Sequence, residues 1–81
     1  MNIPETQKGK IVLLMAEFDT GIVLNFDGSR YKKTDEYHYK IMDSMEDAEK
    51  FAKAKINEET ACVEFIFYDH NGNYICTISP I

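Results

Sequence analysis

The C-terminal part of the chain constrains the fold most strongly, because its pattern predicts two strands joined by a tight turn. Segments 61–68 (ACVEFIFY) and 74–78 (YICTI) are rich in β-branched and aromatic residues, and 69–72 (DHNG) stands between them. Asn-Gly in this position is a strong hairpin signal, since both residues tolerate the positive φ that a tight turn requires. The sequence therefore predicts a C-terminal β-hairpin.

The strand register of this hairpin has two solutions. A two-residue turn pairs Phe67 with Cys76 and makes one face of the hairpin uniformly apolar. A type I turn with a bulge at Gly72 pairs Phe67 with Ile75 instead, and Asp69 suits its first position. A shift of one residue turns every side chain to the other face of the sheet. The cleaner apolar face favours the first solution.

A helix is predicted between residues 43 and 57. Asp43 and Ser44 are both suitable N-caps, and Glu46 follows Asp43 at the spacing of a capping box. An apolar stripe recurs at helical spacing: Met45, Ala48, Phe51, Ala52 and Ile56. Two oppositely charged pairs stand four residues apart: Glu46–Lys50 and Glu49–Lys53. A helix with one apolar face must pack on a flat surface, which here is a sheet.

Three more strands are predicted before the helix. Segment 10–18 is apolar on both alternating sides, as in a strand buried on both faces, and a turn separates it from 22–26. Segment 37–42 alternates between apolar and polar residues. We therefore predict an α+β fold, in which one amphipathic helix packs on a mostly antiparallel sheet of four or five strands. Residues 1–8 are expected to form a flexible arm and 9–81 a single domain.

The predicted sheet has more apolar surface than one helix can cover. The second face still carries Ile66, Tyr68, Ile75 and one side of segment 10–18. Exposed apolar patches of this kind usually mark interfaces. The sequence therefore predicts a homodimer or a protein partner. The competing interpretation is that the sheet curves enough to close this face by itself.

Composition excludes some classes of function. Apolar residues make up 44 % of the 81 residues, charged residues 28 %, and the net charge is -5. This acidic balance argues against nucleic-acid binding, which needs basic residues for the phosphates. No apolar run approaches the roughly 20 residues of a membrane span, and the N-terminal sequence lacks the apolar region of a secretion signal. We therefore expect a cytoplasmic protein with no membrane contact.

The sequence offers no catalytic or metal-binding motif. His38 and His70 stand in different segments, and no pair of ligands has the spacing of a zinc site. Along the predicted hairpin, Cys62 and Cys76 lie roughly 14–17 Å apart in strand offset, well beyond the 7 Å that a disulfide allows. They are expected to be free, buried thiols. We predict no cofactor, no metal and no catalytic residue, which favours a non-catalytic protein over an enzyme.

Segment 30–40 (RYKKTDEYHYK) is the candidate binding segment because it interleaves basic and aromatic residues. Its candidate binding residues are Arg30, Tyr31, Lys32, Lys33, Tyr37 and Tyr39. Tyr and Arg are enriched at the energetic centres of protein interfaces, and basic residues beside aromatics can also hold a nucleotide. A purely structural interpretation is an exposed loop and an edge strand whose lysines prevent aggregation. Asp35 and Glu36 in the same segment count against phosphate binding.

The predicted function is that of a small, non-catalytic cytoplasmic binding or regulatory module that acts through protein–protein contacts. One alternative is a small enzyme or ligand-binding domain whose site forms at a homodimer interface. The other is an acidic inhibitor of a basic partner, which would occupy a basic groove with the acidic side chains of residues 43–59.

Overall fold

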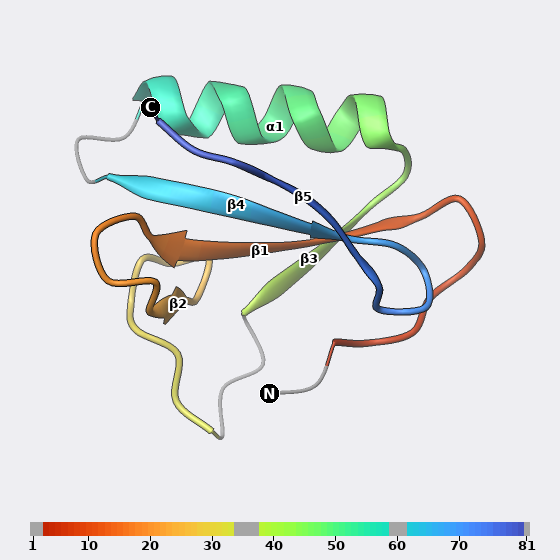
Figure 1. Ribbon diagram of the computed structural model, residues 1–81, viewed down its shortest axis with the longest axis horizontal. Coiled ribbons are helices and arrows are strands. Elements are labelled where there is room, and N and C mark those ends of the chain that lie inside the picture. The colour runs from red at the N-terminus through yellow and green to blue at the C-terminus, as the bar shows by residue number, and fades with distance from the viewer. Residues whose placement is uncertain (1–2, 34–37, 59–61, 81) are drawn as a thin grey trace.

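A computed structural model of the protein describes residues 3–33, 38–58 and 62–80. Within these ranges one helix lies across an antiparallel sheet, which is the α+β fold that the sequence predicts (Figure 1). The elements in chain order are β1 (Ile11–Glu17), β2 (Val23–Leu24), β3 (Tyr39–Met42), α1 (Met45–Glu58), β4 (Val63–Tyr68) and β5 (Tyr74–Ile78). In this part of the chain, no helix is long and apolar enough to cross a membrane.

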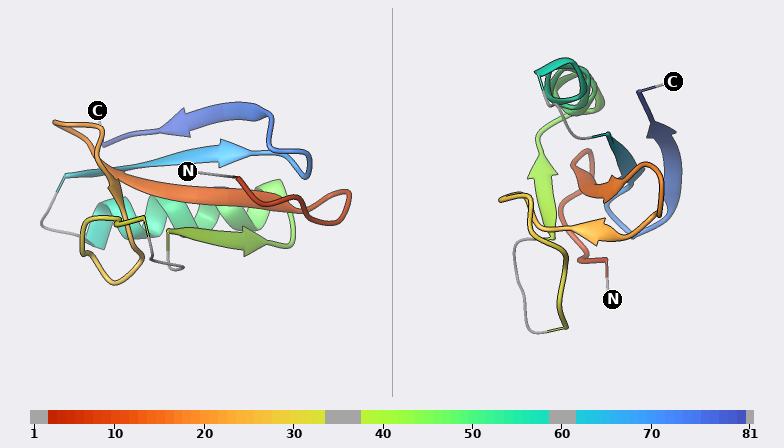
Figure 2. Two further views of the ribbon diagram at one scale, coloured as in Figure 1. Left: turned by 90° about the horizontal axis from the view of Figure 1, so that it is seen from below. Right: turned by 90° about the vertical axis from the view of Figure 1, so that its left-hand side faces the viewer.

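β1 is the central strand of the sheet. β4 pairs with one edge of β1, and β5 pairs with β4. The other edge of β1 is shared by β3 and β2, which lie end to end along it. Every pairing is antiparallel, so β3 and β4 run parallel to each other with β1 between them. α1 connects these two strands across one face of the sheet (Figure 2).

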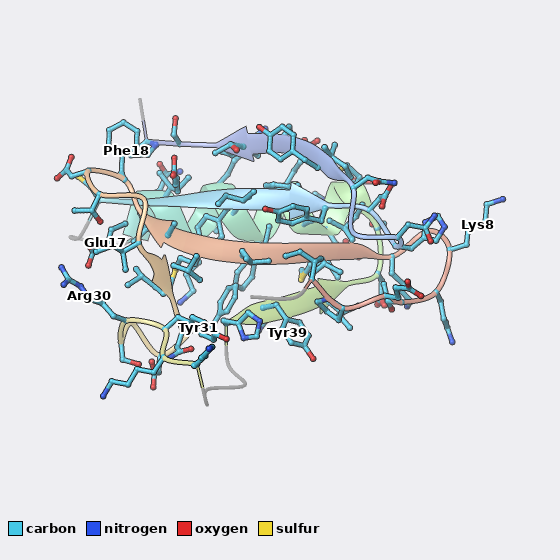
Figure 3. All side chains as sticks on the ribbon, turned by 60° about the horizontal axis from the view of Figure 1, so that its bottom comes forward. Lys8, Glu17, Phe18, Arg30, Tyr31 and Tyr39 are labelled. Atoms are coloured by element: carbon cyan, nitrogen blue, oxygen red, sulfur yellow. The ribbon has the colours of Figure 1, made fainter. Side chains whose placement is uncertain are left out.

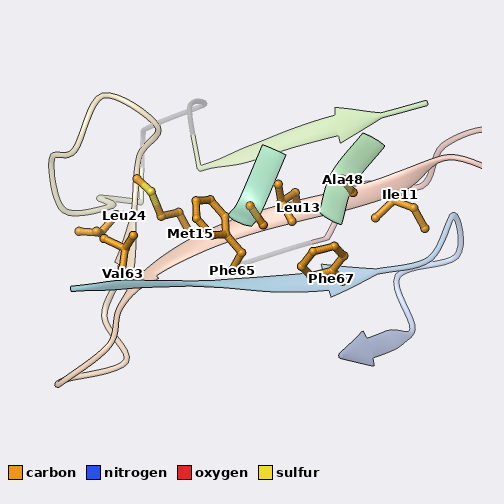
Figure 4. Packing of buried hydrophobic residues seen from close by; sticks show 9 residues of the cluster. Ile11, Leu13, Met15, Leu24, Ala48, Val63, Phe65 and Phe67 are labelled. Atoms are coloured by element: carbon orange, nitrogen blue, oxygen red, sulfur yellow. The ribbon is translucent and has the colours of Figure 1, made fainter. Parts of the chain in front are cut away.

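The hydrophobic core lies between α1 and the sheet (Figure 4). Leu13 of β1 and Phe65 and Phe67 of β4 are completely buried, and Ala48 and Ala52 bring the helix against them. All five residues of the predicted helical stripe belong to this cluster or pack against it. The other alternating side of β1 is buried as well, since Val12, Leu14 and Ala16 are 0 % exposed. The prediction of a strand buried on both faces is confirmed.

The helix begins where its capping residues predict. The Oγ atom of Ser44 accepts a hydrogen bond from the Asp47 amide at 3.2 Å, so Ser44 is the N-cap. Asp43 has a different role, because its carboxylate accepts a hydrogen bond from the Lys10 ammonium next to β1. The pairs Glu46–Lys50 and Glu49–Lys53 form at 3.2 and 3.9 Å.

The turn between β4 and β5 is the longer of the two predicted. The Gly72 amide donates to the Asp69 carbonyl at 3.1 Å, and the Asp69 amide donates to the Asn73 carbonyl at 2.9 Å. Gly72 has φ +84°, the left-handed conformation that glycine adopts without strain. The Oδ1 atom of Asp69 also accepts the amides of Asn71 and Asn73, both at 2.9 Å. The carboxylate of Asp69 thus holds the turn together.

The register of the hairpin combines both predicted solutions. The three-residue loop sets Tyr68 opposite Tyr74, and a register shift then sets Phe67 opposite Cys76. Ile75 is the extra residue at this bulge. The loop alone would have turned Cys76 away from the helix, and the bulge brings it back to the side where it packs against the core. The loop of the second solution therefore coexists with the strand register of the first.

The second and third strands are shorter than predicted. Segment 22–26 contributes only Val23–Leu24, because the Asn25 amide donates to the Ser29 carbonyl at 2.7 Å and so begins a turn. The Oδ1 atom of Asp27 accepts the Ser29 amide at 2.9 Å inside this turn. Segment 37–42 forms a strand from Tyr39 onward, and residue 37 lies outside the described residues.

The described part of the N-terminal arm, residues 3–8, runs back beneath the sheet on the side away from α1 (Figures 1 and 2). The Thr6 amide donates to the carbonyl of His70 in the hairpin turn at 3.0 Å. Ile3 lies against the same turn, since a Cβ atom on Gly72 would stand 3.5 Å from the Ile3 Cβ atom. Ile3 and Pro4 are half-buried. The arm therefore packs on the face that the helix leaves uncovered.

Candidate interaction surface

Arg30, the first residue of the candidate binding segment, is held within the fold. Its Nε atom lies 3.1 Å from Oε2 of Glu17 and its Nη2 atom 3.3 Å from Oε1, a two-point ion pair (Figure 3). Its backbone forms a bridge with Leu24, the last residue of β2. Lys32 and Lys33 follow on an exposed loop. Arg30 thus anchors this loop to the end of β1, while the two lysines remain at the surface.

The two described tyrosines of the segment are brought together through a histidine. The ring centroid of His38 lies 4.6 Å from that of Tyr31 and 5.0 Å from that of Tyr39. His38 is 8 % exposed, and neither ring nitrogen has a hydrogen-bond partner in the described part of the chain. The sequence did not indicate this role for His38. Tyr37, the other predicted binding tyrosine, lies outside the described residues.

Tyr39 joins this segment to the face of the sheet opposite α1, which we call the open face. Strand pairing places the side chains of this face in two rows across the sheet. One row consists of Ile41, Val12, Tyr68 and Tyr74, and the next of Tyr39, Leu14, Ile66 and Thr77. The candidate binding segment therefore reaches the open face through Tyr39.

The open face is less bare than the sequence predicts. The inner members of the two rows, Val12 and Leu14, are completely buried, and Tyr39, Ile66 and Tyr68 are half-buried. The described part of the N-terminal arm runs along this same face (Figure 2). Exposed apolar area remains at the outer members of one row, where Ile41 is 44 % and Tyr74 61 % exposed. The bulge residue Ile75 adds a further side chain that is 40 % exposed.

The rings on this surface are fixed by their neighbours. Tyr68 and Tyr74 meet edge to face with centroids 6.2 Å apart, and the Tyr74 hydroxyl lies 3.0 Å from the Thr77 hydroxyl. On the other side of the sheet, Lys40 places its ammonium 5.1 Å from the Phe51 ring centroid. Lys40 therefore belongs to the helix side of the sheet, whereas Tyr39 belongs to the open face.

The carboxylates whose pKa values are shifted are those that form hydrogen bonds within the fold. The pKa values of four carboxylates, Glu17, Asp27, Asp43 and Asp69, are held below their ordinary values, in each case chiefly by a hydrogen bond. These hydrogen bonds come from Thr20, from the Ser29 side chain, from Lys10 and from the Asn73 amide, respectively. A general base working near neutral pH needs a raised carboxylate pKa, so these shifts have the wrong direction for that role.

The cysteines and histidines show no arrangement suited to chemistry. Cys62 and Cys76 are both free thiols. Burial, and secondarily the charge of Glu49, raises the pKa of Cys76 and makes its thiol less reactive. Cys62 is exposed, contrary to the prediction, because it precedes β4 and contributes only its carbonyl, which accepts the Phe18 amide at 3.0 Å. Among the described residues, no three His, Cys, Asp or Glu side chains gather as metal ligands.

One pocket of about 280 Å³ opens between the C-terminal half of α1 and the loop after β2. Its lining residues are Met15, Leu24, Phe26, Asp27, Gly28, Lys55 and Val63. The Asp27 carboxylate at its rim already accepts two hydrogen bonds from Ser29, at 2.6 and 2.9 Å. Asp27, one of the two charged residues in the lining, is therefore already engaged within its own turn.

Comparisons with protein-family models, with curated proteins and with solved structures found no match.

Proposed function

We propose that this protein is a small, non-catalytic cytoplasmic module that acts through protein–protein contacts, and that the open face is its main contact surface. The observation that carries the proposal is the exposure of Ile41 and Tyr74 at the two ends of one row, 44 % and 61 %. Between them the row is apolar and tightly packed. A firm apolar centre flanked by exposed apolar groups is the usual anatomy of a contact surface.

The residue types of the open face support the same proposal. Tyrosine is enriched at interface hot spots, because it combines a large apolar ring with one polar group at low entropic cost. Tyr39 is held by the ring of His38, and Tyr74 by Tyr68 and Thr77. Side chains that are already fixed lose less entropy on binding. Lys32 and Lys33 lie on the loop that leads to this face and would supply a polar rim.

The competing acidic-inhibitor function would use the other side of the molecule. Two of its acids, Glu46 and Glu49, lie on α1 in ion pairs with Lys50 and Lys53. These pairs offset part of the negative charge that a basic partner would need. The open face is therefore the stronger candidate surface.

Affinity capture from cell lysate with quantitative mass spectrometry tests the proposal when variants are compared with the wild type. We expect Ile41→Glu to lose the captured partner, because the change places a charge in an apolar contact. Lys32→Glu with Lys33→Glu should weaken capture if the candidate binding segment takes part in the contact, because both lysines are exposed in that segment. Glu46→Lys with Glu49→Lys should leave capture unchanged. Circular dichroism confirms beforehand that each variant is folded.

The opposite pattern would contradict the proposal. If the helix variant loses the partner while Ile41→Glu retains it, the acidic surface is the contact and the acidic-inhibitor function is favoured. Turnover of a small molecule by the purified protein would instead favour the alternative of an enzyme whose site forms between two copies.

A further inference from the structure

We infer that the outer edge of β5 pairs with β5 of a second copy of this chain, so that two antiparallel strands join two sheets into one. β5 is the last strand in the sheet order, and no described strand pairs with its outer edge. An unpaired edge presents backbone N–H and C=O groups whose natural complement is another extended strand. Three of its five residues are exposed: Tyr74, Ile75 and Thr77.

The two edges of the sheet differ in how they are protected. In proteins that stay monomeric, the edge strands are usually very short, or carry lysine, proline or a bulge. The edge opposite β5 follows this rule, because β2 has two residues and β3 carries the exposed Lys40. β5 has no charged residue, and its bulge at Ile75 leaves Cys76, Thr77 and Ile78 in regular register. Of the two sheet edges that the described strands form, only the β5 edge is thus long and uncharged.

The occupant is a second copy because β5 is complementary to itself. The chain carries a net charge of -5, yet none of its charged residues lies in β5, so two copies can meet there without directly opposed like charges. A hollow of about 320 Å³ lies beside this edge between α1 and the end of β5. Its apolar lining residues are Ile56, Ile78 and Pro80. A second copy approaching β5 would cover this hollow.

The pairing register follows from the faces of the sheet. In a two-fold antiparallel pair, residues directly opposite each other share a face. If the two-fold axis between the two β5 strands passes at Thr77, the Thr77 residues of both copies stand opposite each other on the open face. Cys76 then stands opposite Ile78 of the second copy on the helix side. An axis at Cys76 would instead set Ile78, on the helix side, opposite Tyr74, which lies on the open face. The structure therefore favours the axis at Thr77.

Sedimentation analysis over protein concentrations of the order of 10 µM to 1 mM tests this inference. We expect the wild-type protein to form dimers as its concentration rises. Thr77→Lys places two lysines opposite each other and should raise the dimer dissociation constant about tenfold or more. Thr77→Val loses the same hydroxyl without adding charge, and should still dimerise. Ile41→Lys adds the same charge to an exposed site on the opposite edge and should also dimerise.

A second measurement needs no variant. Hydrogen exchange of the β5 amides in the wild-type protein should slow as the concentration rises, whereas exchange in β3 should not change. The inference is overturned if the wild-type protein is monomeric throughout, or if Thr77→Lys dimerises as well as the wild type. It is also overturned if Ile41→Lys abolishes the dimer, since the copies would then meet through the open face.

The inference does not depend on the proposed function. The proposed function is tested by affinity capture with the Ile41→Glu variant, whereas the dimer is tested by sedimentation. A strictly monomeric protein could therefore still bind a partner through the open face. Conversely, loss of dimerisation in Thr77→Lys would hold even if Ile41→Glu retained every captured protein.

Discussion

At the scale of single residues, one carboxylate holds the turn between β4 and β5 together. Asp69 suits the first position of the longer of the two predicted turns, and its carboxylate accepts the amides of Asn71 and Asn73 at 2.9 Å. The position of His38, by contrast, cannot be predicted from its local sequence. Its neighbour Tyr31 is brought to it by the bridge between Arg30 and Leu24, a contact that local sequence does not encode.

Asp69 should make stability depend on pH. Hydrogen bonds, first from the Asn73 amide, hold its pKa in the folded protein below the ordinary 3.8. Its stabilising contribution is therefore complete well above pH 3.8 and is lost as the pH falls through the folded value. We predict that Asp69→Asn, which cannot ionise, is less stable than the wild type at pH 7. The difference in free energy of unfolding should shrink at pH 3. Urea unfolding at both pH values measures it, and an equal difference at the two values would contradict this account.

Phe65 is a completely buried aromatic residue of the hydrophobic core. It is 0 % exposed, and its ring centroid lies 6.0 Å from Phe51 and 6.3 Å from Phe26. Phe65→Ala should lower the free energy of unfolding by about 3–5 kcal/mol, because it removes a buried ring and leaves a cavity. Tyr74→Ala, which truncates a ring that is 61 % exposed, serves as the control and should cost much less. Equal losses in urea unfolding would show that Phe65 is not central to the core.

At the scale of elements, the sequence predicted each helix and strand but not where each strand ends. Segment 22–26 has strand composition, yet the turn from Asn25 to Ser29 reduces β2 to Val23–Leu24. The sequence also left two alternatives for the strand register of the hairpin, because the register depends on packing as well as on the turn. Asp69 and Gly72 specify the loop, whereas packing against α1 specifies that Cys76 faces the core, and the bulge at Ile75 reconciles the two.

The start of α1 provides a matched pair of variants. Ser44 caps the helix through the Asp47 amide, whereas the adjacent Asp43 only pairs with Lys10 at the surface. Ser44→Ala should therefore lower the free energy of unfolding by about 1 kcal/mol. Asp43→Ala should lower it less, since exposed ion pairs contribute little. Thermal unfolding at pH 7 compares the two, and a larger effect for Asp43→Ala would identify Asp43 as the cap.

At the scale of the whole molecule, the sequence predicted a helix on one face of a sheet and an apolar second face. It did not predict how much of that face would be covered, because cover by the arm depends on long-range contacts such as Thr6 with His70. It also did not single out the β5 edge, since strand order in a sheet follows from tertiary pairing. The candidate binding segment was found from its composition alone, but its continuity with the open face emerged only through the pairing of Tyr39 with Leu14.

The arm should contribute to global stability. Deleting residues 1–6 removes the half-buried Ile3 and Pro4 together with the hydrogen bond of Thr6 to His70. We expect the free energy of unfolding to fall by about 1–3 kcal/mol, from lost apolar burial and one hydrogen bond. Glu5→Ala, at an exposed position in the same arm, should have no measurable effect. Unchanged stability of the deletion variant would mean that the arm does not cover the open face in solution.

The central claim is that partners contact the side of the sheet away from α1. Hydroxyl-radical footprinting of the wild-type protein, alone and bound to a captured partner, tests it most directly. We predict that Ile41 and Tyr74, both well exposed in the free protein, lose reactivity in the complex, and that reactivity on α1 does not change. Protection confined to α1, with Ile41 and Tyr74 as reactive as before, would contradict the account.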